Sequence, residues 1–309
     1  MLNKEIQDDL IAKGRAFLRG YRENDPYADA FESDQDLKLP QPPLVKAAKT
    51  ADSSIGLTRD FTQLPMLHNL TQLLESRHSA RIYTQENMNL TQLAFLLWAC
   101  QGVKSVRGKS YATLRTVPSG GARHPFETYL VVRKIDGLKP GIYHYLPMDH
   151  ALEYLHSIDN LETVISESLC DQSWAAKANV LFYWTIVPYR AEWRYGIHAH
   201  RTALMDAGHM AENLYLACTG IGLGTCAIAS FSDEICNQML GVDGVDEYTV
   251  YAMPVGTVRE SDKADEQSFS SSSKTKTFNS SALKYLKRHD ENRNPSCRLL
   301  FRWQAGKWS

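Results

Sequence analysis

Long apolar segments are absent from this sequence of 309 residues. The longest apolar runs, near 93–100 and 178–187, are too short to cross a bilayer, and the charged start, Met1 to Asp9, has no apolar signal core. The sequence also lacks an excess of charge of either sign, because its formal net charge is only -1. That balance argues against nucleic-acid or membrane-surface binding by the whole chain, so we expect a cytoplasmic protein.

Cysteine pairs of the kind that hold metals are missing too. None of the six cysteines forms a C-x-x-C pair, and most have apolar neighbours, which is typical of reduced core thiols. A zinc site or a catalytic thiol is the weaker alternative. His198 and His200 are two residues apart and would not share a helix face, so we expect no metal.

Three segments of different composition divide the chain. Residues 1–65 are expected to form an amphipathic helix over 4–21 and then an extended, Asp- and Pro-rich arm that is not a packed unit. Residues 66–259 form the core domain. Residues 260–309 combine a mobile Ser-rich linker with a basic, aromatic tail, which is expected to pack on its own or a partner subunit. Nucleic-acid binding by this tail is the weaker alternative.

The core mixes helical and strand patterns without a regular βαβ rhythm, which predicts an α+β fold with a central antiparallel or mixed sheet flanked by helices. Asp159, with Glu162 at the third position, and Ser232 are expected to be helix N-caps. The expected helices are 90–100 and 202–218, and the expected strands are 126–135, 141–146, 151–156, 179–187 and 247–256.

Small residues recur every four positions in the helix expected over 202–218 and just before it. The row comprises Ala199, Ala203, Ala207 and Ala211, with Gly208 beside it. Such a row lets another helix approach closely. The partner is either a helix of the same subunit or a helix of a second copy.

Two arginines, a histidine and a serine stand together in Arg77-His78-Ser79-Ala80-Arg81. Guanidinium groups match phosphate oxygens in a bidentate manner, and a serine hydroxyl adds a hydrogen bond. This segment therefore predicts a phosphate site, although a solvated basic surface has the same composition.

Two later segments add to this pattern. Pro118-Ser119-Gly120-Gly121 contains glycines that let the backbone approach a flat ring, or simply form a turn. The segment 222–231 is small and apolar, as in a buried strand after a helix-ending glycine. In this order, and with residues about 70–256 around them, the three segments resemble the nitroreductase-like family and more closely its SagB-type dehydrogenase branch.

The resemblance implies an intertwined homodimer with FMN at its interface. It assigns Arg77 and Ser79, in the motif with His78, to the phosphate and ribityl chain, and Arg81 to the pyrimidine edge, where a cation stabilises reduced flavin. It places Pro118, Ser119, Gly120 and Gly121 at the flavin across the dimer. It sets Ala227, Ile228 and Ala229 against the ring, with the Ala229 amide toward N5. Arg259, Lys274 and Lys276 are candidates for a late phosphate-binding cation.

One position departs from the family pattern. Azoline-forming SagB-type enzymes carry a Lys-Tyr pair where this chain has Arg194 and Tyr195. Arginine stays protonated and is a poor base, which puts azole formation in doubt. Tyr195 is either a proton donor or a packing residue.

The expected function is that of an FMN-dependent oxidoreductase acting on a small-molecule or peptide substrate. NADH or NADPH would bind only transiently, because no G-x-G-x-x-G fingerprint opens a βαβ unit. The alternatives are a flavin-holding subunit without turnover in a peptide-modifying complex and, more remotely, a nucleic-acid module.

Overall fold

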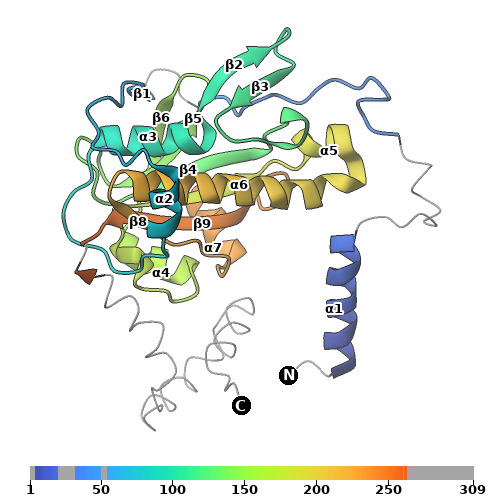
Figure 1. Cartoon of the computed structure of the whole chain (residues 1–309). Coiled ribbons are helices and arrows are strands. Elements are labelled where there is room, and N and C mark those ends of the chain that lie inside the picture. Colours follow the sequence, from blue (N-terminus) through green and yellow to red (C-terminus); the bar gives the residue numbers. More distant parts are fainter. Residues whose placement is uncertain (1–3, 20–31, 50–53, 260, 263–309) are drawn as a thin grey trace.

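The computed structural model describes residues 4–19, 32–49, 54–259 and 261–262. Its centre is a seven-stranded sheet with the order β1-β6-β5-β4-β7-β9-β8, in which every pair of neighbours is antiparallel (Figure 1). The strands are β1 (Ser54–Gly56), β4 (Phe126–Val132), β5 (Gly141–Leu146), β6 (Ala151–His156), β7 (Val180–Ile186), β8 (Leu223–Thr225) and β9 (Tyr248–Thr257). The expected α+β fold is therefore confirmed, with an antiparallel sheet.

Alternating side chains of the central strands build two apolar cores, one on each face of the sheet. In β7, Phe182 and Trp184 belong to one core, whereas Leu181 and Tyr183 belong to the other. All residues of β7 are buried, which explains why its sequence is a continuous apolar run.

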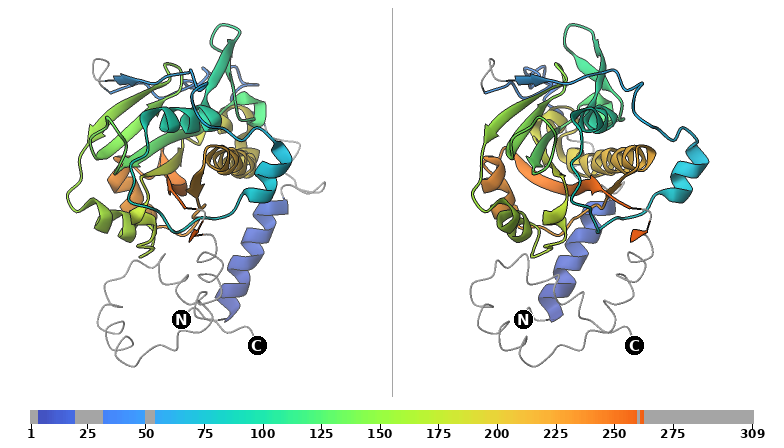
Figure 2. Two further views of the ribbon diagram at one scale, coloured as in Figure 1. Left: turned by 60° about the vertical axis from the view of Figure 1, so that its left-hand side comes forward. Right: turned by 90° about the vertical axis from the view of Figure 1, so that its left-hand side faces the viewer.

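Helices cover both faces of the sheet (Figure 2). The longest, α6 (Ala199–Gly220), packs with α3 (Leu90–Gln101) on one face, and α4 (Leu161–Ser168) and α7 (Asp233–Leu240) cover the other. A capping box between Asn89 and Gln92 starts α3, and the Ser232 side chain accepts from the Ile235 amide to start α7, as predicted.

The predicted N-cap of α4 is wrong by one residue. The helix follows Asn160, which has φ 52 and makes no side-chain cap bond. Left-handed backbone is tolerated by asparagine, so the chain turns there instead of at Asp159. Glu162 does not close a capping box and pairs with Arg133 and Lys177 instead.

The row of alanines on α6 faces the interior of the subunit. Ala199, Ala203, Ala207 and Ala211 are all buried in the single chain, and the last three belong to the core shared with α3. The alternative in which this row meets a second copy is not the one adopted, because a helix of the same chain already fills the space. Gly208 lies on the exposed side of α6.

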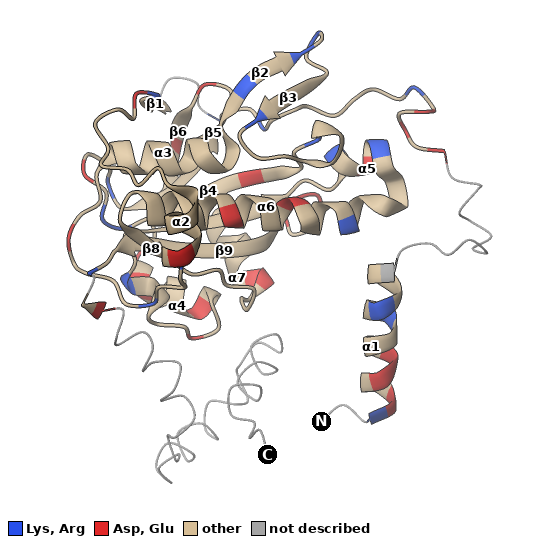
Figure 3. Cartoon of the chain, in the orientation of Figure 1, with Lys and Arg blue, Asp and Glu red and all other residues tan. Residues whose placement is uncertain are grey.

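Outside the sheet, a hairpin of β2 (Val103–Arg107) and β3 (Ala112–Arg115) projects from the domain, and short helices α2 (Leu70–Ser76) and α5 (Tyr189–Tyr195) flank α6. The expected N-terminal helix is α1 (Lys4–Arg19), which carries charges of both signs (Figure 3).

Residues 32–49 of the expected arm contain no helix or strand but are fastened to the domain. They are hydrogen-bonded to α5, to the hairpin and to the sheet. The tail beyond Asp262, with Lys274 and Lys276, lies outside the described residues.

No helix in the described part of the chain is long and apolar enough to span a membrane. Cys100, Cys218 and Cys236 are buried free thiols, whereas Cys170 is disulfide-bonded, so the expectation of reduced core thiols is wrong for Cys170. Burial raises the pKa of the Cys236 thiol to about 12, which makes a thiolate nucleophile there unfavourable. Among the described residues, His, Cys, Asp and Glu form no group that could hold a metal.

Candidate active site

The first and third motifs are adjacent in the structure. The Ala80 amide donates to the Thr225 carbonyl at 2.9 Å, and Ser79 forms a parallel bridge with Thr225. These segments are nearly 150 residues apart in the chain, so the sheet edge at β8 brings them together.

Tyr215 of α6 joins the two motifs through its side chain. Its hydroxyl lies 3.0 Å from Ser79 Oγ and accepts from the Ala227 amide at 2.8 Å. The Arg77 guanidinium stands over its ring, 5.1 Å from the centroid. Burial raises the pKa of Tyr215, so the phenol stays neutral and can hold both partners. We call Arg77, Ser79, Tyr215 and Ala227 the Tyr215 cluster.

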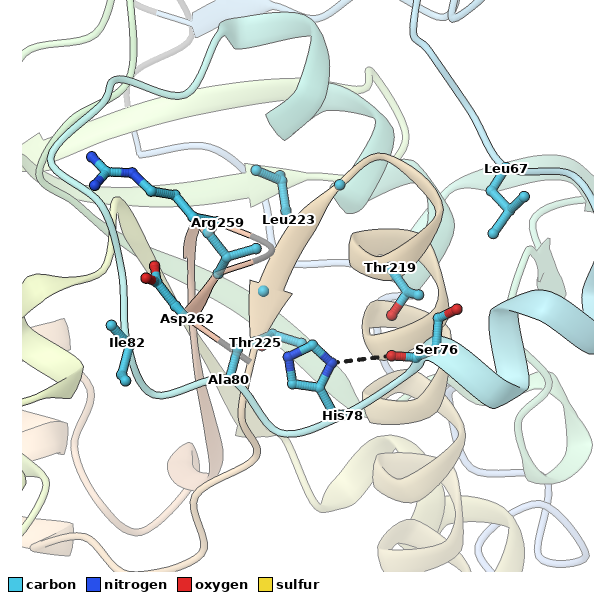
Figure 4. A pocket seen from close by; sticks show the side chains of 13 residues that line it. Leu67, Ser76, His78, Ala80, Ile82, Thr219, Leu223, Thr225, Arg259 and Asp262 are labelled. Atoms are coloured by element: carbon cyan, nitrogen blue, oxygen red, sulfur yellow. Dashed lines mark hydrogen bonds between the residues drawn. The ribbon is translucent and has the colours of Figure 1, made fainter. Parts of the chain in front are cut away.

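Residues of the first motif alternate in their surroundings, as expected of extended backbone. The Arg81 guanidinium lies 5.8 Å from the Trp174 ring centroid. His78 instead lines a pocket of about 240 Å³, together with Arg259 and Thr219 (Figure 4). The predicted flavin-binding basic residues therefore lie in three places, with His78 and Arg259 in the pocket, Arg77 beside Tyr215 and Arg81 beside Trp174.

The third motif begins beside Tyr215 and then pairs with β9. Ile228 is buried and exchanges two backbone hydrogen bonds with Ala252 of β9, at 2.8 and 3.2 Å. Ala229 is exposed at the end of the segment.

The second motif forms a separate cluster at the other end of α6. Pro118 is exposed, and the loop after it is held by Asp206, which accepts from Ser119 Oγ at 2.6 Å and from the Gly120 amide at 3.1 Å. Burial raises the pKa of Asp206. This residue was not predicted from the sequence, although a carboxylate beside the alanine row was a usable signal.

Gly120 and Gly121 lie directly against the Arg-Tyr pair. A Cβ on Gly120 would stand 2.4 Å from Thr202 Cγ2, and one on Gly121 would stand 2.5 Å from the Tyr195 hydroxyl. These distances are below any normal contact, so a larger residue at either position would force a neighbouring side chain to shift. The glycines thus let the loop approach Tyr195 within the same chain.

Arg194 and Tyr195 end helix α5 and are both partly buried. Arg194 donates to the Tyr111 hydroxyl at 2.7 Å, and its guanidinium lies 5.6 Å from the Tyr195 ring centroid. We call Gly120, Gly121, Arg194 and Tyr195 the glycine-loop cluster.

One chain does not bring the two clusters together. Asp206 and Tyr215 are nine residues apart on α6, which corresponds to about 14 Å along the helix axis. The glycine loop of the same chain therefore does not lie beside the Tyr215 cluster.

These features agree with the comparison to known proteins. The Nitroreductase family model matches residues 74–257, which is more than half of the chain, so the chain belongs to the Nitroreductase family. Protein MJ1384 of Methanocaldococcus jannaschii, named as a nitroreductase, is 32% identical over 196 residues, covering 63% of this chain and 94% of that protein.

Two further relatives are processing proteins of peptide toxins by name, and the chain spans less than half the length of each. The microcin B17-processing protein McbC of Escherichia coli is 29% identical over 133 residues, covering 42% of this chain and 49% of McbC. The trifolitoxin-processing protein TfxB of Rhizobium leguminosarum is 31% identical over 145 residues, covering 46% of this chain and 39% of TfxB.

Solved structures confirm the fold. A nitroreductase from Ralstonia eutropha superposes with a TM-score of 0.55 at 25% identity, covering 72% of this chain and all of that one. A chain of the Escherichia coli microcin synthetase McbBCD complex superposes with a TM-score of 0.51 at 20% identity, covering 83% and 93%.

Proposed function

We propose that this oxidoreductase of the Nitroreductase family is FMN-dependent. The observation that carries the proposal is the Tyr215 cluster, where one phenol holds Ser79 and Ala227 from two distant motifs and supports the Arg77 guanidinium. No carboxylate of the described residues forms an ion pair with Arg77. A half-buried cation without an acidic partner, beside a hydroxyl, fits a phosphate-bearing group.

Different residues hold different parts of FMN. Arg77 and Ser79 bind the phosphate and ribityl chain, with Arg259 contributing positive charge and His78 lining the same neighbouring pocket. Arg81 stabilises charge at the pyrimidine edge, and Ala227, Ile228 and Ala229 border the ring. When bound, FMN supplies hydride transfer through its N5 atom.

A homodimer supplies the missing glycine loop. The two clusters of one chain are too far apart along α6, so the loop at the flavin comes from the partner subunit. The exposed side of α6 offers apolar contact for that partner, since Leu204 and Met205 are 49% and 57% exposed. The alanine row is not this interface, because α3 already covers it.

The substrate is a small molecule or a peptide, and NADH or NADPH is the transient electron donor. The relatives named for microcin B17 and trifolitoxin processing support a peptide substrate. Arg194 in place of lysine argues against azoline oxidation, because arginine does not act as a base at working pH. This replacement also supports the second candidate function, a flavin-holding subunit without turnover.

The visible absorption spectrum of the purified protein, with the mass of the released cofactor, tests the proposal. We expect bound FMN, lost in Arg77→Ala and retained in the matched control Arg107→Ala, which removes an exposed arginine of β2. A protein that neither contains nor takes up FMN would refute the proposal. Turnover of NADH or NADPH with an artificial acceptor would exclude the flavin-holding alternative.

A further inference from the structure

The N-terminal arm is fastened to helix α5 at several points. The Gln35 amide donates to the Trp193 carbonyl at 2.8 Å, and Trp193 Nε1 donates back to the Leu39 carbonyl at 3.0 Å. The Tyr189 hydroxyl donates to Asp34 at 2.7 Å. Two of these three bonds involve Trp193, near the end of α5, and Trp193 is buried.

The other end of the arm is fastened to the same helix through a buried carboxylate. Glu127 of β4 accepts from the Lys46 amide at 2.9 Å and pairs with Arg190 of α5 at 2.6 Å through the same oxygen. Lys46 also contacts Glu247 and donates to the Tyr129 hydroxyl at 2.7 Å. The arm between Asp34 and Lys46 therefore spans α5 and is bound at both ends.

Helix α5 transmits this constraint to the glycine-loop cluster. Arg194 and Tyr195 are its last two residues, and the adjacent Trp193 makes two of the three hydrogen bonds between the arm and α5. Gln35 Nε2 also donates to the Tyr111 hydroxyl at 3.3 Å, the group that receives Arg194 Nη1. A short helix of seven residues has little stability of its own, so its end depends on what holds it.

We infer that residues 34–46 are a positioning strap for Arg194 and Tyr195. The strap touches neither glycine of the loop but fixes the helix end that does, so Gln35 and Trp193 are positioning residues. This role rests on the proposed function, in which the glycine-loop cluster borders the flavin.

Two substitutions loosen the strap without changing Arg194 or Tyr195. Gln35→Pro removes the amide that donates to the Trp193 carbonyl, and Trp193→Phe removes the indole N–H while retaining an aromatic ring. Trp98→Phe on α3 is the matched control, because it removes an indole N–H away from α5. Each variant is made in the full chain and in a Tyr195→Phe background.

The first readout is amide hydrogen exchange of residues 189–196, which needs no flavin. Each strap variant loses one hydrogen bond between the arm and Trp193, which predicts about a threefold to tenfold loss of protection. Gln35→Pro also loses the side-chain bond to Tyr111, and Trp98→Phe loses none of these bonds. The second readout is kcat with NADH and an artificial acceptor. We expect a fall in kcat with KM nearly unchanged, and we expect this fall to disappear in the Tyr195→Phe background, since coupled residues are not additive.

Three outcomes are distinguishable. Unchanged α5 protection in both strap variants would overturn the inference, as would an equal fall in kcat with and without the Tyr195 hydroxyl. If the wild type contains FMN normally and either of these two results is obtained, the strap is refuted but the proposed function is not. A wild type without FMN and without turnover refutes the proposed function, and the positioning role with it.

Discussion

Gly121 offers a sharp test of how the second motif meets Tyr195. Its φ is 56, and a Cβ there would lie 2.5 Å from the Tyr195 hydroxyl and 2.8 Å from Arg194 Cδ. Gly121→Ala therefore carries two costs, one from the backbone and one from the contact. Gly137→Ala isolates the first, because Gly137 has φ 82 and a Cβ added there would meet no atom within 4 Å.

The magnitudes separate the two variants. A non-glycine residue in left-handed backbone costs about 1 to 2 kcal/mol, and this is the expected loss in the free energy of unfolding for Gly137→Ala. Forcing a methyl group into a filled space adds about 1 to 3 kcal/mol. Gly121→Ala should therefore lose about 2 to 5 kcal/mol.

Urea unfolding of the full chain, followed by tryptophan fluorescence, measures both losses. Adding Tyr195→Phe to Gly121→Ala removes the nearer of the two contacts and should recover part of the excess. Equal losses for the two alanine variants would show that the glycine loop does not lie against Tyr195, and the glycine-loop cluster would then be rejected.

Three further predictions concern buried polar groups. Tyr215→Phe removes the hydroxyl that links the first and third motifs. The free energy of unfolding should therefore fall by about 1 to 2 kcal/mol, and the affinity for FMN should fall with it. An unchanged urea midpoint and an unchanged FMN titration would contradict this. Burial opposes ionisation of Glu127, but Arg190 and His144 outweigh it and lower its pKa. Its carboxylate thus stabilises the fold above about pH 4.3 and loses this effect as the pH falls, so Glu127→Gln should flatten the acid side of a plot of Tm against pH. Burial raises the pKa of Asp206, so its ionisation costs stability as the pH rises above about 4. Asp206→Asn should therefore gain Tm relative to wild type as the pH rises from about 4, and a parallel profile would refute this reading.

Local patterns were sufficient for most of the sheet and its helices. The hairpin of 141–146 and 151–156 was predicted with the observed bounds, because two short alternating runs flank a polar turn. Residues 180–186 form a buried strand as expected, because a continuous apolar run between turns suits a strand covered on both faces. The α4 cap was missed because Asp and Asn at 159 and 160 are both good candidates, and the backbone turn decides between them.

The three motifs and their order, and with them the family, were readable from the sequence alone, because each is a short segment whose residue types carry the chemistry. Only the tertiary structure decided which residues hold the three motifs in place. Tyr215 and Asp206 contact the motifs because α6 passes beside them. The arm is held as a strap by contacts between residues far apart in the chain, such as Lys46 with Glu247. Such pairings depend on packing between distant segments, and no local periodicity encodes them.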